Sequence, residues 1–185
     1  MGVRGNREKP TYKAVDVLRQ YCKDVLMHRR AVRVFPNTYI GMFEGDLFEV
    51  SEAGYLTEIE LKLSRSDLFG DVKKSFRKRN WKYKHNDPQA YQTILKYDLI
   101  KSGLRCNRFF YLTPKGMVSV DELPVPYAGL IEFTVTEYRG RLYWNFHIVK
   151  PAVRLSQEKY GTKWLPKLME STYFRFHLSR FEKKS

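Results

Sequence analysis

The sequence predicts an α/β fold in which a mixed central sheet is flanked by helices, with residues 1–185 forming one domain. Strand-like segments, either alternating or wholly apolar, lie between segments whose apolar residues recur every three or four positions, as on one face of a helix. The clearest strand signal is a hairpin over 44–67. A content of 43% hydrophobic and 15% aromatic residues argues against disorder and supports a packed core.

The first predicted elements are a helix and a strand. After residues 1–10, a polar and basic stretch expected to form a loose, flexible arm, apolar residues recur at three and four positions over 11–30. The basic residues in the last turn suit the negative end of the helix dipole. The segment 31–35 is predicted to be a strand that ends at Pro36 and Asn37.

The turn of the hairpin sets the expected register. Residues 52–54, with sequence Glu-Ala-Gly, separate two strand-like segments, 47–51 and 55–63. A three-residue loop with glycine last suits a type I turn closed by a left-handed residue. If the turn centres on Ala53, residues whose numbers sum to 106 face each other. At the charged end the opposed pairs are Asp46 with Glu60 and Glu44 with Lys62.

Alternation along the two strands separates charged from apolar side chains. These four charged residues fall on one face, and the apolar residues on the other face are Leu47, Ile59, Leu61 and Leu63. Directly opposed carboxylates repel each other and favour a nearby cation. Lys62 supplies one positive charge, but two carboxylates and a backbone carbonyl also form a set of hard oxygen ligands suited to magnesium. The alternative interpretation is a solvated strand face, on which charged residues alternate by default.

These residues resemble a known catalytic signature. Asp46, a hairpin and then Glu60-Leu61-Lys62 look like the D…(D/E)xK motif of the PD-(D/E)XK nuclease superfamily. The stretch TEIELKLSRSDLFGDVKK is similar to the MmcB-like branch of that superfamily, which is found in bacteria and phages and linked to DNA repair. Three later stretches, CNRFFYL, TPKG and PYAGLI, also resemble that branch, so the resemblance extends over roughly residues 32 to 132.

The resemblance implies a restriction-endonuclease-like core and hydrolysis of DNA phosphodiester bonds with Mg²⁺ or Mn²⁺, in DNA repair or phage DNA metabolism. Asp46 and Glu60 would hold the metal together with the backbone carbonyl of Leu61, and Lys62 would orient or activate the attacking water. The protein would then act in the cytoplasm of a bacterium or of a phage-infected cell. A catalytically silent DNA-binding or repair-accessory protein of the same fold is the alternative.

Several other polar residues are additional candidates for the site. Glu44 and Glu58 share the predicted active face, although the favoured interpretation is that they are solvated or salt-bridged. Ser64 or Ser66 is expected to cap a helix that starts at the SRSD sequence, and an exposed helix start could also receive a phosphate. The superfamily often takes a further acid from its first helix, and the choice between the two acids there stays open: Asp16 and Asp24.

The charge of the chain points to a polyanionic partner. With 34 Lys and Arg against 20 Asp and Glu, the net charge is +14 and the isoelectric point is about 9.8. Residues 73–85 contain seven Lys or Arg, no acid and three interleaved aromatic residues, and are predicted to form a helix and a following loop that contacts nucleic acid. A solvated face is the alternative. The candidate contacts are Arg65, Lys73, Lys74, Arg77, Lys78, Arg79, Lys82 and Lys84.

The rest of the chain supplies the remaining predicted elements. A helix should begin at Asp87-Pro88 and end at Gly103. A central strand is expected at 108–112 and a short strand at 118–120. The core is predicted over about 11–135, and a C-terminal hairpin and helix are predicted as an addition over about 130–181. The strands of that hairpin are expected at 130–137 and 141–149, with a three-residue turn between them, and the helix at 162–180.

Other classes of protein fit less well. No apolar run approaches the roughly 18 residues needed to span a bilayer, and the first residues lack the apolar core of a signal peptide, so a cytosolic protein is expected. An anionic membrane is a weaker partner than nucleic acid, because the basic run has no long apolar face. Cys22 and Cys106 lack a zinc-binding spacing and are predicted to be buried free thiols.

Overall fold

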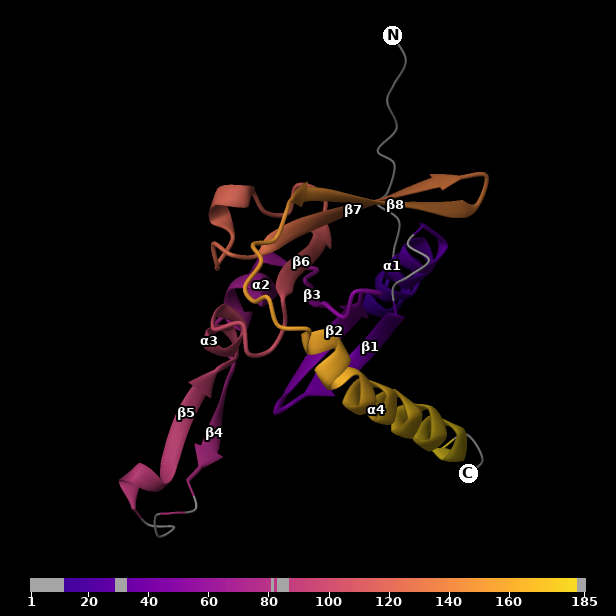
Figure 1. Cartoon of the computed structure of the whole chain (residues 1–185). Helices are drawn as coiled ribbons and strands as arrows, with labels where there is room; N and C mark the ends of the chain where they lie inside the picture. Colours follow the sequence, from indigo (N-terminus) through magenta and orange to yellow (C-terminus); the bar gives the residue numbers. More distant parts are fainter. Residues whose placement is uncertain (1–11, 29–32, 81, 83–86, 183–185) are drawn as a thin grey trace.

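The computed structural model describes residues 12–28, 33–80, 82 and 87–182. A mixed sheet of six strands lies at its centre, in the order β1-β2-β3-β6-β7-β8 (Figure 1). The pairs β3–β6 and β6–β7 are parallel and the other neighbours are antiparallel. The strands are β1 (Arg33–Ile40), β2 (Phe43–Val50), β3 (Leu56–Leu61), β6 (Arg108–Pro114), β7 (Gly129–Tyr138) and β8 (Arg141–Lys150).

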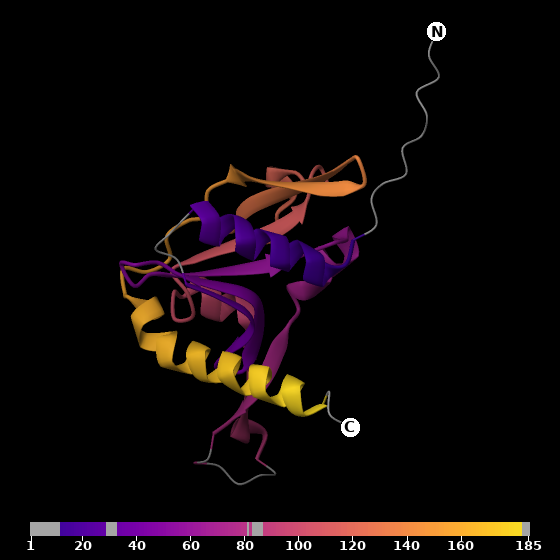
Figure 2. The same cartoon turned by 90° about the vertical axis from the view of Figure 1, so that its right-hand side faces the viewer.

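Helices cover both faces of the sheet, as the sequence predicted. The helix α1 (Ala14–His28) packs on one face, and α4 (Tyr160–Glu182) lies on the opposite side (Figure 2). Two short helices, α2 (Arg65–Asp71) and α3 (Lys96–Lys101), share the second face with α4. The residues of α1 that are buried against the first face are Val17, Leu18, Tyr21 and Val25.

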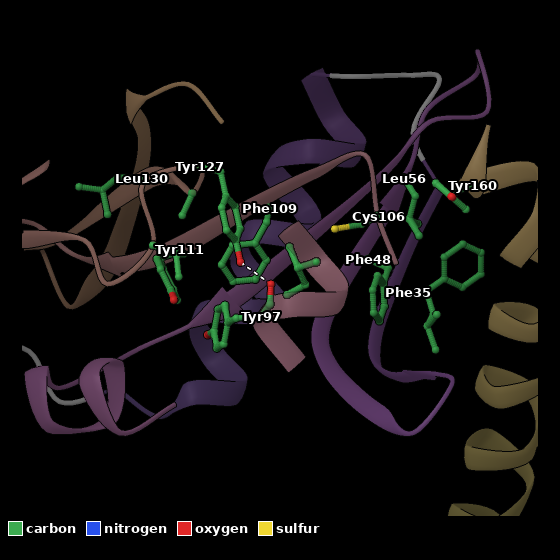
Figure 3. Packing of buried hydrophobic residues seen from close by; sticks show 14 of the residues in the cluster. Phe35, Phe48, Leu56, Tyr97, Cys106, Phe109, Tyr111, Tyr127, Leu130 and Tyr160 are labelled. Carbon is green, nitrogen blue, oxygen red and sulfur yellow. Dashed lines mark hydrogen bonds between the residues drawn. The ribbon is translucent and has the colours of Figure 1, made fainter. Parts of the chain in front are cut away.

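The strand β6 belongs to both cores, because alternate side chains point to opposite faces of a strand. Phe110 and Leu112 pack beneath α1, while Phe109 and Tyr111 lie in the cluster on the other face. In that cluster the Phe109 and Tyr111 rings meet edge to face with centroids 4.9 Å apart (Figure 3). The prediction of a central strand buried on both faces is therefore confirmed.

The first predicted hairpin, over 44–67, forms in the predicted register. The paired residues of β2 and β3 run from Leu47 with Ile59 to Val50 with Leu56, so their numbers sum to 106. Gly54 closes the turn at φ +82° and its amide donates to the Ser51 carbonyl over 2.9 Å. A left-handed glycine at this position is what the three-residue turn requires.

Two predictions about local structure are wrong. Strand β1 does not end at Pro36 but continues to Ile40. Asn37 adopts φ +47°, yet the pairing with β2 keeps the same register on both sides of it, with Pro36 opposite Leu47 and Thr38 opposite Gly45. The edge position of β1 tolerates the proline. Residues 118–120 form no strand, and a 3-10 helix, Val120–Glu122, follows instead.

The C-terminal hairpin is part of the central sheet and not an addition to it. The strand β7 pairs in parallel with β6, and β8 forms the edge of the same sheet. Its turn has two residues instead of three: Arg139 and Gly140 have φ values of 51° and 72°, and Tyr138 pairs with Arg141. Two successive left-handed residues suit the twist of a two-residue hairpin.

The largest error concerns the basic segment. Instead of a helix and loop, it contains β4 (Ser75–Arg79), which pairs with β5 (Tyr91–Leu95) in a two-stranded ribbon that projects from the body of the molecule (Figure 1). The helix expected from Asp87 to Gly103 is reduced to a 3-10 turn at Pro88–Ala90 and the six residues of α3. No helix within the described ranges is long and apolar enough to cross a membrane.

Candidate active site

The predicted catalytic residues meet where the β2–β3 ladder ends. Leu47 with Ile59 is the last regular pair, and beyond it Asp46 Oδ2 accepts a hydrogen bond from the Leu61 amide over 2.9 Å. Asp46 and Glu60 are thus neighbours in the predicted register without being a ladder pair. Asp46 is half-buried, whereas Glu60 is only 1% exposed.

Lys62 lies among three carboxylates. Its Nζ is 3.3 Å from Glu60 Oε2, 3.3 Å from Asp71 Oδ1 and 4.0 Å from Asp67 Oδ1. Burial alone would lower the pKa of Lys62, but Glu60 and the other nearby carboxylates outweigh it and raise that pKa. The ammonium group therefore stays protonated and can only donate hydrogen bonds.

A second lysine, which the sequence analysis missed, binds the other side of Glu60. Lys96 is fully buried at the start of α3, and its Nζ donates to Glu60 Oε1, lies 3.0 Å from Glu58 Oε1 and donates to the Glu44 carbonyl over 3.2 Å. Its pKa is raised because Glu58 and Glu60 outweigh the effect of burial. One clue was present in the sequence, since Lys96 is the only charged residue between Tyr91 and Tyr97.

Arg105 completes the neutralisation of Glu58 and was also missed. Its Nε and Nη2 donate to the two oxygens of Glu58 over 2.5 and 2.9 Å, and the same guanidinium donates to the carbonyls of Ile40 and Phe43. Burial would raise the pKa of Glu58, but Arg105 and Lys96 lower it. Glu58 is therefore a salt-bridged structural residue, as its favoured interpretation held.

Asp71 at the end of α2 anchors Lys62 from the other direction. It accepts hydrogen bonds or ion pairs from Tyr97, Lys74 and Lys62. Burial would raise the pKa of Asp71, but Lys74 and Tyr97 lower it, so the carboxylate stays ionised. We call the six buried charged residues of this site the ion network: Glu58, Glu60, Lys62, Asp71, Lys96 and Arg105.

Glu60 and Asp46 differ from the other carboxylates in their titration. Burial, with smaller contributions from Asp46 and Glu58, raises the pKa of Glu60 to about 7 despite the ammonium of Lys96. Burial also raises the pKa of Asp46, against the effect of Lys62. Two neighbouring carboxylates that resist ionisation would be stabilised in the ionised form by an additional cation.

Solvent reaches the site through a cavity of about 490 Å³ between α1 and the end of β3. Its charged lining residues are Asp46, Lys62, Asp67 and Lys74, and Leu18 of α1 contributes to its apolar wall. We call this space the catalytic cavity. It brings one carboxylate of the predicted metal pair and the predicted catalytic lysine to the same solvent-filled space.

Other predicted site residues lie elsewhere or have structural roles. Glu44 does not face Lys62, because its carboxylate pairs with Arg175 of α4 over 2.5 Å. Ser64 is the N-cap of α2 and accepts from the Asp67 amide, as the capping prediction held, and its hydroxyl is also 3.0 Å from that of Ser66. Leu63, expected in the core, is 38% exposed.

Neither acid of the first helix completes the site. Asp16 accepts from the Lys13 amide and lies 3.9 Å from Arg19, as expected for a residue in the first turn of α1. Asp24 lies 3.6 Å from His28. Neither of them lines the catalytic cavity. The additional acids beside Lys62 come from α2 instead.

The candidate nucleic-acid contacts fall into four groups. Lys73, Lys74, Arg77, Lys78 and Lys82 are exposed, Arg79 is half-buried, and Lys84 lies outside the described residues together with Trp81 and Tyr83. Arg65 is committed elsewhere, because it forms a two-point ion pair with Glu122 and donates to the Met117 carbonyl. The exposed cations follow the path of β4 away from the catalytic cavity.

The two cysteines are free in the structure. Cys106 is buried and Cys22 is half-buried, so the prediction of buried free thiols is confirmed fully for Cys106 only. Among the residues that the structure describes, no three Asp, Glu, His or Cys side chains converge as a metal centre.

Comparisons with known proteins support the fold. No family model matches the chain, and no curated protein matches it. The solved structure of the SPO1766 protein of unknown function from Silicibacter pomeroyi is similar, with a TM-score of 0.51 and 15% sequence identity over 86% of each chain. At this identity the likeness concerns the fold alone. The chain is thus an α/β protein with a mixed, helix-flanked central sheet that has a structural relative of unknown function.

Proposed function

We propose that the protein is a metal-dependent nuclease that hydrolyses DNA phosphodiester bonds at the Asp46, Glu60 and Lys62 cluster. The observation that carries the proposal is that Asp46 and Lys62 line one cavity, while Glu60 lies buried behind them, 3.3 Å from the Lys62 ammonium. The order of elements also supports the resemblance to PD-(D/E)XK nucleases, because a helix and three antiparallel strands precede a helix and a parallel strand.

The donor set fits a magnesium or manganese ion. Asp46 Oδ2 is used by the Leu61 amide, which leaves Oδ1 for an ion, and Glu60 Oε1 is used by Lys96, which leaves Oε2. Lys62 now contacts that Oε2, but it also contacts Asp71 and would keep an acidic partner if an ion displaced it. Asp46, Glu60 and the Leu61 carbonyl would hold the ion. When bound, it would neutralise charge that develops on the phosphate oxygens.

Lys62 has a defined part in this reaction. Because its ammonium group stays protonated, it cannot accept a proton from water and acts instead as a hydrogen-bond donor. Glu60 and Asp71 hold the lysine on two sides, which fixes its Nζ at the wall of the catalytic cavity. From there it would orient the attacking water or a phosphate oxygen.

A second candidate function is a DNA-binding accessory protein without catalysis. The observation in its favour is that both oxygens of Glu60 already contact an ammonium group, so the ion network is neutralised without a metal. The basic surface of β4 would then bind DNA while the buried charges serve only stability. The two functions differ in whether the site takes up a metal.

Substituting Asp46 by asparagine tests the nuclease function. Asparagine keeps an oxygen for the Leu61 amide and removes the charge, so the fold should persist while metal-dependent cleavage falls at least about 100-fold. The assay follows nicking of plasmid and degradation of single-stranded DNA in magnesium, manganese or EDTA. Asp24→Asn, which changes an aspartate outside the cavity, is the matched control and should cleave like the wild type.

Two results would count against the nuclease. Equal cleavage by wild type and Asp46→Asn would place the activity elsewhere. Absence of cleavage by all three proteins in every metal, with DNA binding intact, would favour the accessory function.

A further inference from the structure

A second cavity, of about 610 Å³, lies where the β4–β5 ribbon meets the body of the molecule. Its walls come from the turn between β1 and β2, from both strands of the ribbon, from α3 and the loop after it, and from α4. Its apolar lining includes Met42, Phe76, Ile94, Leu99, Leu104 and Trp164. We call it the ribbon cavity. Neither the proposed metal ligands nor Lys62 line it.

The cationic groups beside the ribbon cavity suit a ligand with an anionic backbone. Arg77, Lys78 and Arg79 of β4 contribute to the wall. Arg77 lies over the Tyr91 ring at 4.6 Å from its centroid, which holds the guanidinium in place on the ribbon.

We propose that the ribbon cavity receives an unpaired base of a DNA single strand whose phosphates contact the basic residues of β4. An apolar cavity with Phe76 and Trp164 in its wall matches a base, whose flat faces pack against aromatic side chains. The row of cations beside it matches the phosphates of the same strand, whereas an apolar peptide has no negative charge to complement it. The inference rests on the proposed function and names its substrate class.

The geometry connects the ribbon cavity to the catalytic cavity. Lys74 lines the catalytic cavity, and residues 76–79 line the ribbon cavity. At about 3.3 Å per residue, an extended chain from Lys74 to Arg79 spans roughly 16 Å. That is the length of about five stacked nucleotides at 3.4 Å each. A base held in the ribbon cavity would therefore set which phosphate, a few nucleotides away, reaches Lys62.

The ion network also touches the ribbon cavity. Arg105 lines it and donates to both oxygens of Glu58, which shares Lys96 with Glu60. Seating a base against this wall would bring it next to the side chains that support the proposed metal site. Double-stranded DNA, whose bases are stacked inside the helix, could use only the cations.

The test measures DNA binding in EDTA, where cleavage plays no part. Fluorescence anisotropy compares a labelled single strand of about twelve thymidines with an abasic strand of equal length and charge. The wild type should bind the base-bearing strand more tightly, and Trp164→Ala should weaken that binding roughly tenfold while leaving abasic and duplex binding unchanged. Tyr173→Ala, on the exposed part of α4, is the matched control and should bind like the wild type.

A second pair of variants separates the contribution of the positive charges to DNA binding from the contribution of the base. Arg77→Gln and Lys78→Gln should weaken both strands by similar factors and reduce the salt dependence of binding. If Trp164→Ala does not fold, Met42→Ala and Leu104→Ala replace it, because both residues line the cavity and are more than half exposed.

Equal affinity of the wild type for the two strands would overturn the proposal, and so would an equal loss for both in Trp164→Ala. If the wild type cleaves DNA but binds both strands equally, only the proposed role of the ribbon cavity is refuted. If it prefers the base-bearing strand but does not cleave DNA, only the proposed nuclease function is refuted.

Discussion

Replacing Lys96 by methionine is expected to lower the free energy of unfolding by about 3–5 kcal/mol, the cost of breaking a buried ion pair by removing one partner. Methionine matches the length of the lysine stem but leaves Glu60 with Lys62 as its remaining cation and Glu58 with Arg105 alone. It also leaves the Glu44 carbonyl without the donor that Lys96 provides. Such a loss is a large fraction of the stability of a typical domain.

Urea denaturation monitored by circular dichroism measures this effect. Lys101→Met makes the same chemical change on the same helix at an exposed position, so it should shift the free energy of unfolding by no more than about 0.5 kcal/mol. Similar small shifts in the free energy of unfolding for both variants would mean that Glu58 and Glu60 are neutralised without Lys96. They would contradict a stabilising role of Lys96 in the ion network.

Substituting Lys62 by glutamine is expected to reduce metal-dependent DNA cleavage by about 100-fold or more at saturating DNA. Glutamine retains hydrogen-bonding capacity but removes the ammonium group at the wall of the catalytic cavity. The fold should survive, because Glu60 keeps Lys96 and Asp71 keeps Lys74 and Tyr97. DNA binding in EDTA should change little, since Lys62 is only 3% exposed.

The matched control is Lys74→Gln. Lys74 also contacts Asp71 and lines the same cavity, but it is half exposed and no ion pair joins it to Glu60. Its loss should weaken DNA binding a few-fold and leave the rate at saturating DNA nearly unchanged. If both variants lose the same fraction of that rate, Lys62 acts through Asp71 and not on the reacting groups.

The hairpin was predictable because its determinants are local. A glycine-closed turn of three residues fixes which positions of β2 and β3 oppose each other, and a shift by one residue would turn every apolar side chain to the wrong face. The observed pairing of Leu47 with Ile59 follows from that turn. Asp46 does not pair with Glu60 through the backbone, because the regular pairing stops at Leu47 and Ile59. Beyond that point the Asp46 carboxylate accepts a hydrogen bond from the Leu61 amide.

The cations of the site were not predictable in the same way. Lys96 and Arg105 lie 36 and 47 residues from the carboxylates they bind, and only the packing of α3 and β6 against β3 brings them together. Opposed carboxylates indicated that a cation was needed, but the sequence pattern could not distinguish a bound metal from a distant lysine. The structure contains the distant lysine, Lys96, beside Glu60, whereas the metal is part of the proposed function.

The ribbon was mistaken for helix because short apolar spacings are ambiguous. Tyr91, Ile94 and Leu95 recur at three and four positions, which matches a helix, yet they lie in a strand whose partner supplies the stabilising contacts. Phe76 pairs across the ribbon with Ile94 and packs edge to face on Phe43. Tertiary contacts of this kind override weak local preferences.

Thermal unfolding in EDTA and in magnesium, for the wild type and Asp46→Asn, tests most directly whether Asp46 and Glu60 hold a metal. Magnesium at about 100 times its dissociation constant should stabilise the wild type by about 2.7 kcal/mol, because the ion binds only the folded state. For a chain of this length that raises the melting temperature by roughly 5–10 °C. Asp46→Asn should melt at the same temperature in both buffers. An equal rise in the two proteins, or no rise in the wild type up to magnesium concentrations on the order of 10 mM, would contradict a metal site at Asp46 and Glu60.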